Sequence, residues 1–161
     1  MHWSDVMAKR LAERGQKHIV ATGITPSGEF HIGHLREILT GDMIARAARR
    51  AGMEAELVFV VDNADPLRKV YRFLDPSYED FIGHQLGSIP APDVDGKPDW
   101  GRFNEEGWTY ADHFLLPFLD ALKQIGVTPR LLPNLEAYQS GKFSSAARIA
   151  CDEPEAIREI I

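Results

Sequence analysis

The 161 residues fit one domain of ordinary size, and their 44% apolar and 26% charged residues are typical of a globular chain. The net charge of −6 argues against non-specific coating of nucleic acid or of an anionic membrane. A single cysteine, Cys151, excludes an internal disulfide framework and a zinc site built from several thiolates. Because the sequence has neither a long apolar run nor a signal-peptide core, we expect a soluble, cytoplasmic protein with one domain over residues 1–161.

The first sixty residues alternate between helical and strand patterns. Apolar spacing predicts an amphipathic helix over 3–14, followed by a short buried strand over 18–24. A polar loop over 25–30 then leads into a helix over 31–50 and a nearly all-apolar strand over 55–62. Strand, helix and strand within about 45 residues form a βαβ unit. The sequence therefore predicts an α/β fold with a parallel sheet.

The middle of the chain changes character. Residues 63–106 hold five of the ten prolines, which predicts a loop-rich excursion with one short helix near 78–83. Long irregular stretches in compact domains are often functional. A long helix is expected over 105–125, with a kink or a break at Pro117.

The last part of the chain predicts a short third strand over 130–133 and a final helix that begins near Ser144. The run over 155–161 stops inside an amphipathic pattern with no cap. Three parallel strands also leave a small sheet with open edges. We therefore expect the sequence to be truncated at its C-terminus, as one half of a larger sheet.

The loop after the first strand carries the strongest chemical pattern. In an open α/β sheet, ligands bind beyond the carboxyl ends of the strands, where this loop lies. The first turn of the following helix offers free N–H groups and a positive dipole end to a polyphosphate. Gly28 allows the turn geometry, and the Ser27 hydroxyl can donate to a phosphate oxygen.

Two imidazoles follow this loop on one face of the next helix. His31 and His34 are three residues apart and can stabilise charge that builds up on a phosphate. Gly33 between them has no side chain, so a flat ring can rest on its backbone. A lone His-x-x-His is more often a surface pair, and no metal-binding His-Glu-x-x-His accompanies it. The dinucleotide and P-loop glycine patterns are absent as well.

Taken together, the residues resemble a known family. The tetrapeptide His-Ile-Gly-His at 31–34, with Pro-Ser-Gly before it, resembles the signature of class I aminoacyl-tRNA synthetases. Further stretches resemble the class I lysyl-tRNA synthetases in particular, namely Thr22–Gly28, His31–Glu37, Asp65–Tyr71, His2–Trp3 and His113–Phe118.

This resemblance implies the first half of a Rossmann-like catalytic domain, a parallel sheet with helices on both faces. It implies that lysine attacks the α-phosphate of ATP, supplied with Mg²⁺, to give lysyl-adenylate, and that the aminoacyl group then passes to tRNA(Lys). No protein-bound metal is expected in this chain, no membrane is implied, and the sequence defines no oligomeric state.

The resemblance also implies roles for individual residues. His31 and His34 would contact the ATP phosphates and act in catalysis, and Gly33 would let the adenine approach. Ser27 and Gly28 would line the phosphate path. By the same resemblance, two residues at the end of the first strand, Gly23 and Thr25, would border the amino-acid pocket.

Charged residues near the strand ends are candidates for a lysine pocket. A buried lysine ammonium needs an acidic partner, and Asp62 and Asp65 follow the second strand. The alternative for Asp65 is turn initiation before a proline. For Glu37 an ion pair with a neighbouring arginine is expected instead of ligand contact. Three basic residues are candidates for phosphate or tRNA contact, or else form a solvated face: Arg36, Arg68 and Lys69.

One departure from the family pattern affects the expected activity. None of the six lysines lies in a Lys-Met-Ser-Lys-Ser run, the second signature of the class. We therefore expect this chain alone to be inactive or weakly active. Two alternatives stay open: a small adenylyltransferase of the same fold, which the length favours, and a non-catalytic nucleotide- or tRNA-binding module.

Overall fold

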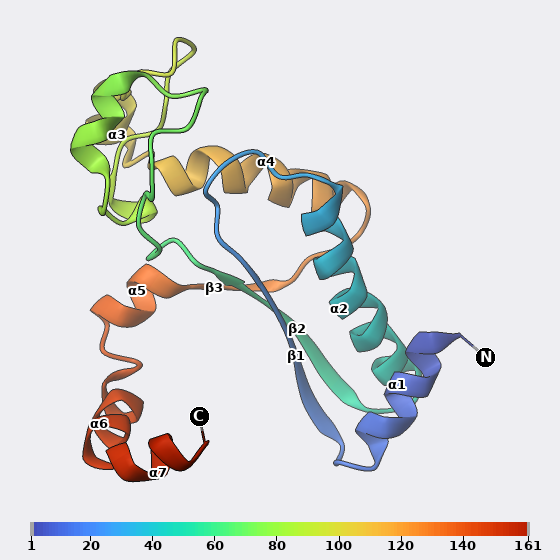
Figure 1. Ribbon diagram of the computed structural model, residues 1–161. Coiled ribbons are helices and arrows are strands. Elements are labelled where there is room, and N and C mark those ends of the chain that lie inside the picture. Colours follow the sequence, from blue (N-terminus) through green and yellow to red (C-terminus); the bar gives the residue numbers. More distant parts are fainter. Residues whose placement is uncertain (1, 161) are drawn as a thin grey trace.

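A computed structural model describes residues 2–160 and shows a three-stranded parallel sheet with flanking helices (Figure 1). The strands β1 (Lys17–Ile24), β2 (Glu54–Val61) and β3 (Arg130–Pro133) lie in the order β1-β2-β3. Ile24, Val61 and Pro133 are in register, so all three strands end at one level. The predicted α/β class and βαβ unit are confirmed. The carboxyl ends of the strands, where a ligand is expected, form one continuous rim.

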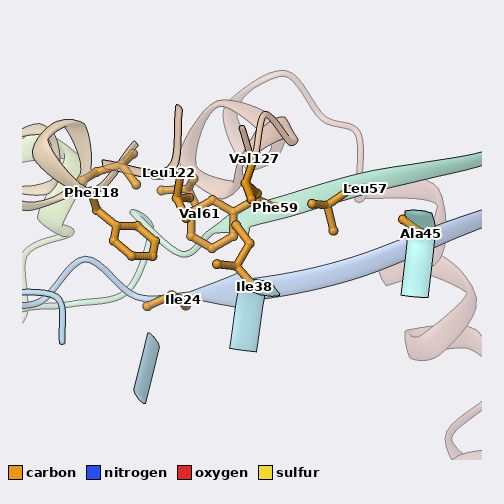
Figure 2. Packing of buried hydrophobic residues seen from close by; sticks show 10 residues of the cluster. Ile24, Ile38, Ala45, Leu57, Phe59, Val61, Phe118, Leu122 and Val127 are labelled. Carbon is orange, nitrogen blue, oxygen red and sulfur yellow. The ribbon is translucent and has the colours of Figure 1, made fainter. Parts of the chain in front are cut away.

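The main core lies between the sheet and two helices, α2 (Ile32–Arg50) and α4 (Tyr110–Gln124). Figure 2 shows side chains of both helices meeting those of β1 and β2, with Phe59 fully buried among them. Alternation along β1 places Ile19 on the opposite face of the sheet, and this side chain is 68% exposed. The core cluster therefore holds α2 against the ends of β1 and β2.

The first helix, α1 (Trp3–Ala12), packs on the last turns of α2. Its start is fixed by two hydrogen bonds of the first turn. The Asp5 carboxylate accepts from the His2 amide at 3.1 Å, and Nδ1 of His2 accepts from the Ser4 amide at 3.3 Å. Ala8 lies against Ala47 and Ala48, where small side chains allow close packing. The predicted helix is confirmed and ends two residues earlier than expected.

The excursion between β2 and α4 contains more helix than the sequence predicts. It holds two 3₁₀ segments, η1 (Pro76–Phe81) and η2 (Leu86–Ser88), and an α-helix, α3 (Trp100–Glu106). Its apolar side chains form a second cluster with the first turns of α4, including the fully buried Tyr78 and Leu86. Figure 1 shows the excursion gathered beside this end of α4. It is a packed lobe rather than an open loop.

The helix predicted over 105–125 is confirmed over Tyr110–Gln124, but its predicted start is wrong. Gly107, at φ +68°, ends α3 in the left-handed conformation, and Thr109 begins α4 with a capping box to Asp112. The expected break at Pro117 is also wrong, because α4 is a single helix that includes this proline. Pro117 is exposed and lines a cavity of about 400 Å³ together with the buried Phe114 and Phe118.

After β3 the chain forms three short helices, α5 (Asn134–Gln139), α6 (Ser144–Asp152) and α7 (Pro154–Ile160). The start of α6 confirms the expected helix, whereas α5 is not predicted by the sequence pattern. The run over 155–161 lies in α7, apart from Ile161, which is outside the described residues. Within residues 2–160, no helix has the length and apolar character needed to cross a membrane.

Candidate functional site

The expected site residues gather on the rim formed by the strand ends. Thr25, Asp62 and Asn134 directly follow β1, β2 and β3, whose last residues are in register. The Asp62 amide donates to the Ile24 carbonyl at 3.1 Å, which continues the strand pairing by one residue. The loop after β1 and the turn after β2 are therefore joined at their roots.

The start of α2 is built from the two candidate histidines. His31 is the N-cap, and its Nδ1 accepts from the Gly33 amide at 3.0 Å. His34 reaches back, and its Nδ1 accepts from the His31 amide at 3.0 Å. This is a capping box in which imidazoles replace the usual hydroxyl and carboxylate. The two ring centroids lie 3.9 Å apart, so the pair forms one unit.

These hydrogen bonds define how the imidazoles can act. Because each Nδ1 accepts a backbone proton, each neutral ring carries its own proton on Nε2. Burial and the nearby His31 lower the pKa of His34, while the Glu37 carboxylate opposes them, so His34 favours the neutral form. His31 is exposed and His34 half-buried, so neither ring is sealed in the core. The site therefore offers two Nε2–H donors beside the positive end of α2.

Gly33 is required by this arrangement. A Cβ at Gly33 would lie 2.8 Å from Cε1 and 2.9 Å from Nδ1 of His31, too close for any real contact. The flat ring that rests on the Gly33 backbone in the structure is thus the imidazole of His31. Gly33 also lines a cavity of about 420 Å³ between β1 and α2. Its lack of a side chain serves the histidine pair first and leaves this cavity open.

The loop over 25–30 is anchored from α4 and from the excursion. The Tyr110 hydroxyl donates to the Ser27 carbonyl at 2.9 Å, and a Cβ at Gly28 would lie 3.8 Å from two ring atoms of Phe73. Phe30 stacks on Phe118 with 4.3 Å between the ring centroids, and its centroid lies 5.0 Å from that of the His34 ring. The loop with the candidate phosphate-binding residues is thereby fixed to the core on two sides.

The two candidate carboxylates differ in their surroundings. Asp65 accepts from the Thr25 hydroxyl at 2.8 Å and pairs with Arg68 at 3.5 Å, so its role exceeds turn initiation. Asp62 accepts from the Asn134 amide group. Burial, and then the negative charge of Asp65, raise the pKa of Asp62, while the Asn134 hydrogen bond opposes them. The negative charge of Asp65 therefore disfavours that of Asp62, and a cation placed between the two carboxylates would relieve this.

Comparisons with known proteins bear directly on this site. A family profile described as "tRNA synthetases class I (K)" matches residues 1–161. This chain belongs to the class I (K) tRNA synthetases. The resemblance inferred from the residues is thus confirmed, including the lysine type.

Individual relatives agree with this family. The chain is 41% identical over 161 residues to a lysine–tRNA ligase of Methanosarcina barkeri. It is 42% identical over 165 residues to one of Methanocaldococcus jannaschii, and 42% over 161 residues to one of Picrophilus torridus. Each match covers all of this chain and 28% or 29% of the relative. The chain thus spans less than a third of the length of these synthetases.

The expectation for Glu37 is wrong in this synthetase chain. Among residues 2–160 Glu37 forms no ion pair with an arginine, and its carboxylate instead accepts from the Gly23 amide at 3.1 Å. In the described part of the chain β1 pairs only with β2, so this amide lies at the open edge of the sheet. A Cβ at Gly23 would lie 3.2 Å from Cβ of Val60. Glu37 thus fixes the backbone at a predicted amino-acid-binding residue.

Sequence reasoning missed three polar residues on the rim. Asn63 is 8% exposed, accepts from the Leu135 amide at 2.8 Å and donates to Glu136 at 3.2 Å. Together with the hydrogen bond between Asn134 and Asp62, these two contacts of Asn63 hold the start of α5 against the end of β2. The sequence does contain a signal for these residues, because Asn134 and Glu136 immediately follow a predicted parallel strand.

Within the described range, no three His, Cys, Asp or Glu residues are placed to hold a metal ion.

Proposed function

We propose that this chain is the N-terminal catalytic portion of a lysine–tRNA ligase and holds the groups that bind ATP and lysine. In the proposed first step, a lysine carboxylate oxygen attacks the α-phosphate, and the bond to the β-phosphate breaks. This releases pyrophosphate and leaves lysyl-adenylate. In the second step, a hydroxyl of the 3′-terminal adenosine of tRNA(Lys) takes the lysyl group and AMP leaves. We further propose that the reaction takes place in the cytoplasm, where tRNA(Lys) is used in protein synthesis.

The observation that carries this proposal is the imidazole capping box at the start of α2. The Nδ1 atoms of His31 and His34 hold the helix start, which leaves both Nε2–H groups to donate to phosphate oxygens of ATP. Donors fixed before the reaction stabilise charge on the transferring phosphate without reorganisation. Gly33 would border the adenine through the cavity beside β1.

The loop before α2 completes the nucleotide site. We assign Ser27 and Gly28 to the phosphate path, because Tyr110 and Phe73 fix this part of the loop. ATP would arrive with Mg²⁺, which shields the phosphate charge as part of the substrate complex.

The rim beside this loop suits the lysine substrate. Gly23 is the next-to-last residue of β1 and Thr25 directly follows the strand, and both are held by carboxylates, those of Glu37 and Asp65. We assign the lysine ammonium to Asp62 and Asp65, because both follow β2 on the rim. Burial, and then the negative charge of Asp65, raise the pKa of Asp62, and a cation would relieve this repulsion. The carboxylate of the same lysine would then face the α-phosphate bound at the start of α2.

The histidine role can be tested by ATP titration of this chain. We compare the wild type with His34→Asn, because the Asn side-chain oxygen can replace Nδ1 in the capping box but offers no Nε2–H. Loss of one charge-assisted hydrogen bond should weaken ATP binding about tenfold or more. Isothermal titration at millimolar ATP measures this, and Lys9→Gln on α1 serves as the exposed control.

The outcomes separate the proposal from its alternatives. Absence of ATP binding to the wild type at millimolar concentration, or equal binding by His34→Asn, would contradict the proposal. Pyrophosphate exchange with ATP then tests the substrate. Weak exchange that depends on lysine supports the ligase, and exchange with a different acceptor supports an adenylyltransferase. Because no Lys-Met-Ser-Lys-Ser run is present, we expect exchange by this chain alone to be slow.

A further inference from the structure

The excursion carries two stacked aromatic rings to which the proposed ATP and lysine sites assign no contact with a ligand. Tyr71 and Phe73 have ring centroids 5.7 Å apart and an interplanar angle of 4°. At this spacing the rings form an offset parallel stack, here named the aromatic platform. Phe73 is 47% exposed and Tyr71 half-buried, so the platform is open to solvent.

Three cations lie along the same six residues. The Lys69 ammonium lies 5.4 Å from the Tyr71 ring centroid, and Arg72 is exposed between the two aromatic residues. Neither cation is in an ion pair with a carboxylate among residues 2–160. Arg68 pairs with Asp65 at 3.5 Å, yet its side chain is 74% exposed. In a chain with a net charge of −6, this segment is a local basic surface.

The surface beyond Phe73 has the opposite charge. Phe73 lines a cavity of about 460 Å³ together with three carboxylate residues, Glu29, Asp93 and Asp95. A polyanion is therefore repelled on that side and attracted on the side of Lys69 and Arg72. This asymmetry favours a ligand whose flat groups lie on the rings while its charged backbone follows the cations.

The platform adjoins the proposed active site at two points. The Phe73 ring faces Gly28 in the phosphate loop, at 3.8 Å from an added Cβ. Arg68 contacts Asp65, which also binds the Thr25 hydroxyl. A single-stranded nucleic acid that crosses the platform would thus have its end at the loop over 25–30, where lysyl-adenylate would be formed.

We propose that the aromatic platform and the cations Lys69 and Arg72 bind the single-stranded 3′ end of an RNA and guide its terminal nucleoside to the loop over 25–30. Unpaired bases stack on aromatic rings, whereas the bases of a duplex are not accessible for such stacking. Lysine and arginine beside the rings neutralise phosphates. This inference rests on the proposed function, in which the terminal adenosine must reach the lysyl-adenylate.

The test uses this chain and an eight-nucleotide RNA ending in CCA, labelled at its 5′ end and followed by fluorescence anisotropy. The charge variant is Lys69→Gln with Arg72→Gln. Its matched control is Lys9→Gln with Arg10→Gln, two exposed cations on α1. The stacking variant is Tyr71→Leu, which keeps the apolar packing of the half-buried ring. Unfolding midpoints and ATP titrations are measured for every variant.

We expect the charge variant to bind the RNA about five- to tenfold more weakly and to reduce the salt slope by about 1.4, the value for two phosphate contacts on a single strand. Tyr71→Leu should weaken binding roughly 5- to 150-fold, as for loss of one stacked base. The control should stay within about twofold of the wild type, and a duplex of the same sequence should bind more weakly.

Three results would overturn the inference: no RNA binding by the wild type, equal binding of duplex and single strand, or an equal effect of the control pair. With ATP binding intact, any of these leaves the proposed function standing. Loss of ATP binding with RNA binding that still depends on the platform would instead overturn the proposed function.

Discussion

At the scale of single residues, the two histidines show why imidazole is suited to this helix start. A Ser or Asp cap would satisfy the free amides of α2 equally well and stabilise the helix by about 1 kcal/mol. An ionised Asp offers no donor, and Ser can donate only from the same hydroxyl that accepts the backbone proton. His31 and His34 cap with Nδ1 and keep Nε2–H for a ligand, so that in the proposed function each side chain both fixes the backbone and contacts the phosphate.

The charge state of His34 makes a prediction about stability and pH. Burial and His31 lower the pKa of His34 below 6.5, so the unfolded chain binds this proton more readily than the folded chain. The free energy of unfolding therefore rises with pH between the folded-state pKa and about 6.5, and the His34 contribution is complete above that value. Acidification from pH 7 toward 5 should destabilise the wild type more than His34→Asn, which keeps an acceptor but does not titrate.

Denaturant unfolding at pH 5, 6, 7 and 8 measures this difference between the two proteins. The comparison is needed because burial and Arg102 also lower the pKa of His113, and His113 titrates equally in both proteins. Parallel pH profiles for the wild type and His34→Asn would show that His34 is not held neutral by the fold.

At the scale of secondary structure elements, the approach of α2 to the sheet depends on Gly41. A Cβ at this position would lie 2.7 Å from Cγ2 of Thr22 and 3.1 Å from Cδ1 of Leu57. Both strands therefore press against the helix backbone at one glycine. This contact sets the height of α2 over β1 and with it the position of the histidines at the helix start.

Gly41→Ala is expected to destabilise the chain in spite of the better helix propensity of alanine. Propensity favours alanine by about 1 kcal/mol, while overpacking in a core costs about 1–3 kcal/mol, so we expect a net loss of up to about 2 kcal/mol in the free energy of unfolding. Thr22→Ser removes the closest methyl group and keeps the hydroxyl that donates to Val58. The double variant should recover part of the loss in a urea titration, and strict additivity would contradict this account.

The predictability of the elements followed the strength of local signals. The three strands and α2 were predicted within one or two residues, because their apolar patterns are strong and bounded by polar loops. The predicted start of the helix over 105–125 was wrong, because the apolar spacing continues across two local signals that separate α3 from α4. Gly107 ends α3, and the Thr109–Asp112 capping box begins α4. The helix α5 has only six residues, and its burial depends on Asn63, 72 positions earlier in the chain.

The candidate site divides in the same way. The histidines could be predicted as a pair because three-residue spacing on a helix fixes their common face. The contact of Glu37 with Gly23 could not, since it depends on how close α2 lies to the end of β1. Contacts across the tertiary structure carry no local pattern, and the same holds for the Tyr110 hydroxyl on Ser27, 83 positions apart.

At the scale of the whole molecule, α4 joins two hydrophobic clusters. Leu115, Phe118 and Leu122 belong to the sheet core, and Tyr110 and Phe114 to the core of the excursion. Phe30, in the loop over 25–30, packs against both clusters. The proposed nucleotide site thus lies at the junction of the clusters, so loosening of either one should reach the loop through α4.

Leu86→Ala tests whether the two clusters unfold together. Leu86 is fully buried in the excursion, and its truncation should lower the free energy of unfolding by about 2–5 kcal/mol. If α4 couples the clusters, hydrogen exchange of the β2 amides should accelerate by the same free energy, at least about 30-fold. Leu131→Ala, the same change at a residue that is 38% exposed, should have a smaller effect. Faster exchange confined to the excursion, with β2 protection unchanged, would mean that the lobe opens alone and that the phosphate loop is held by the sheet.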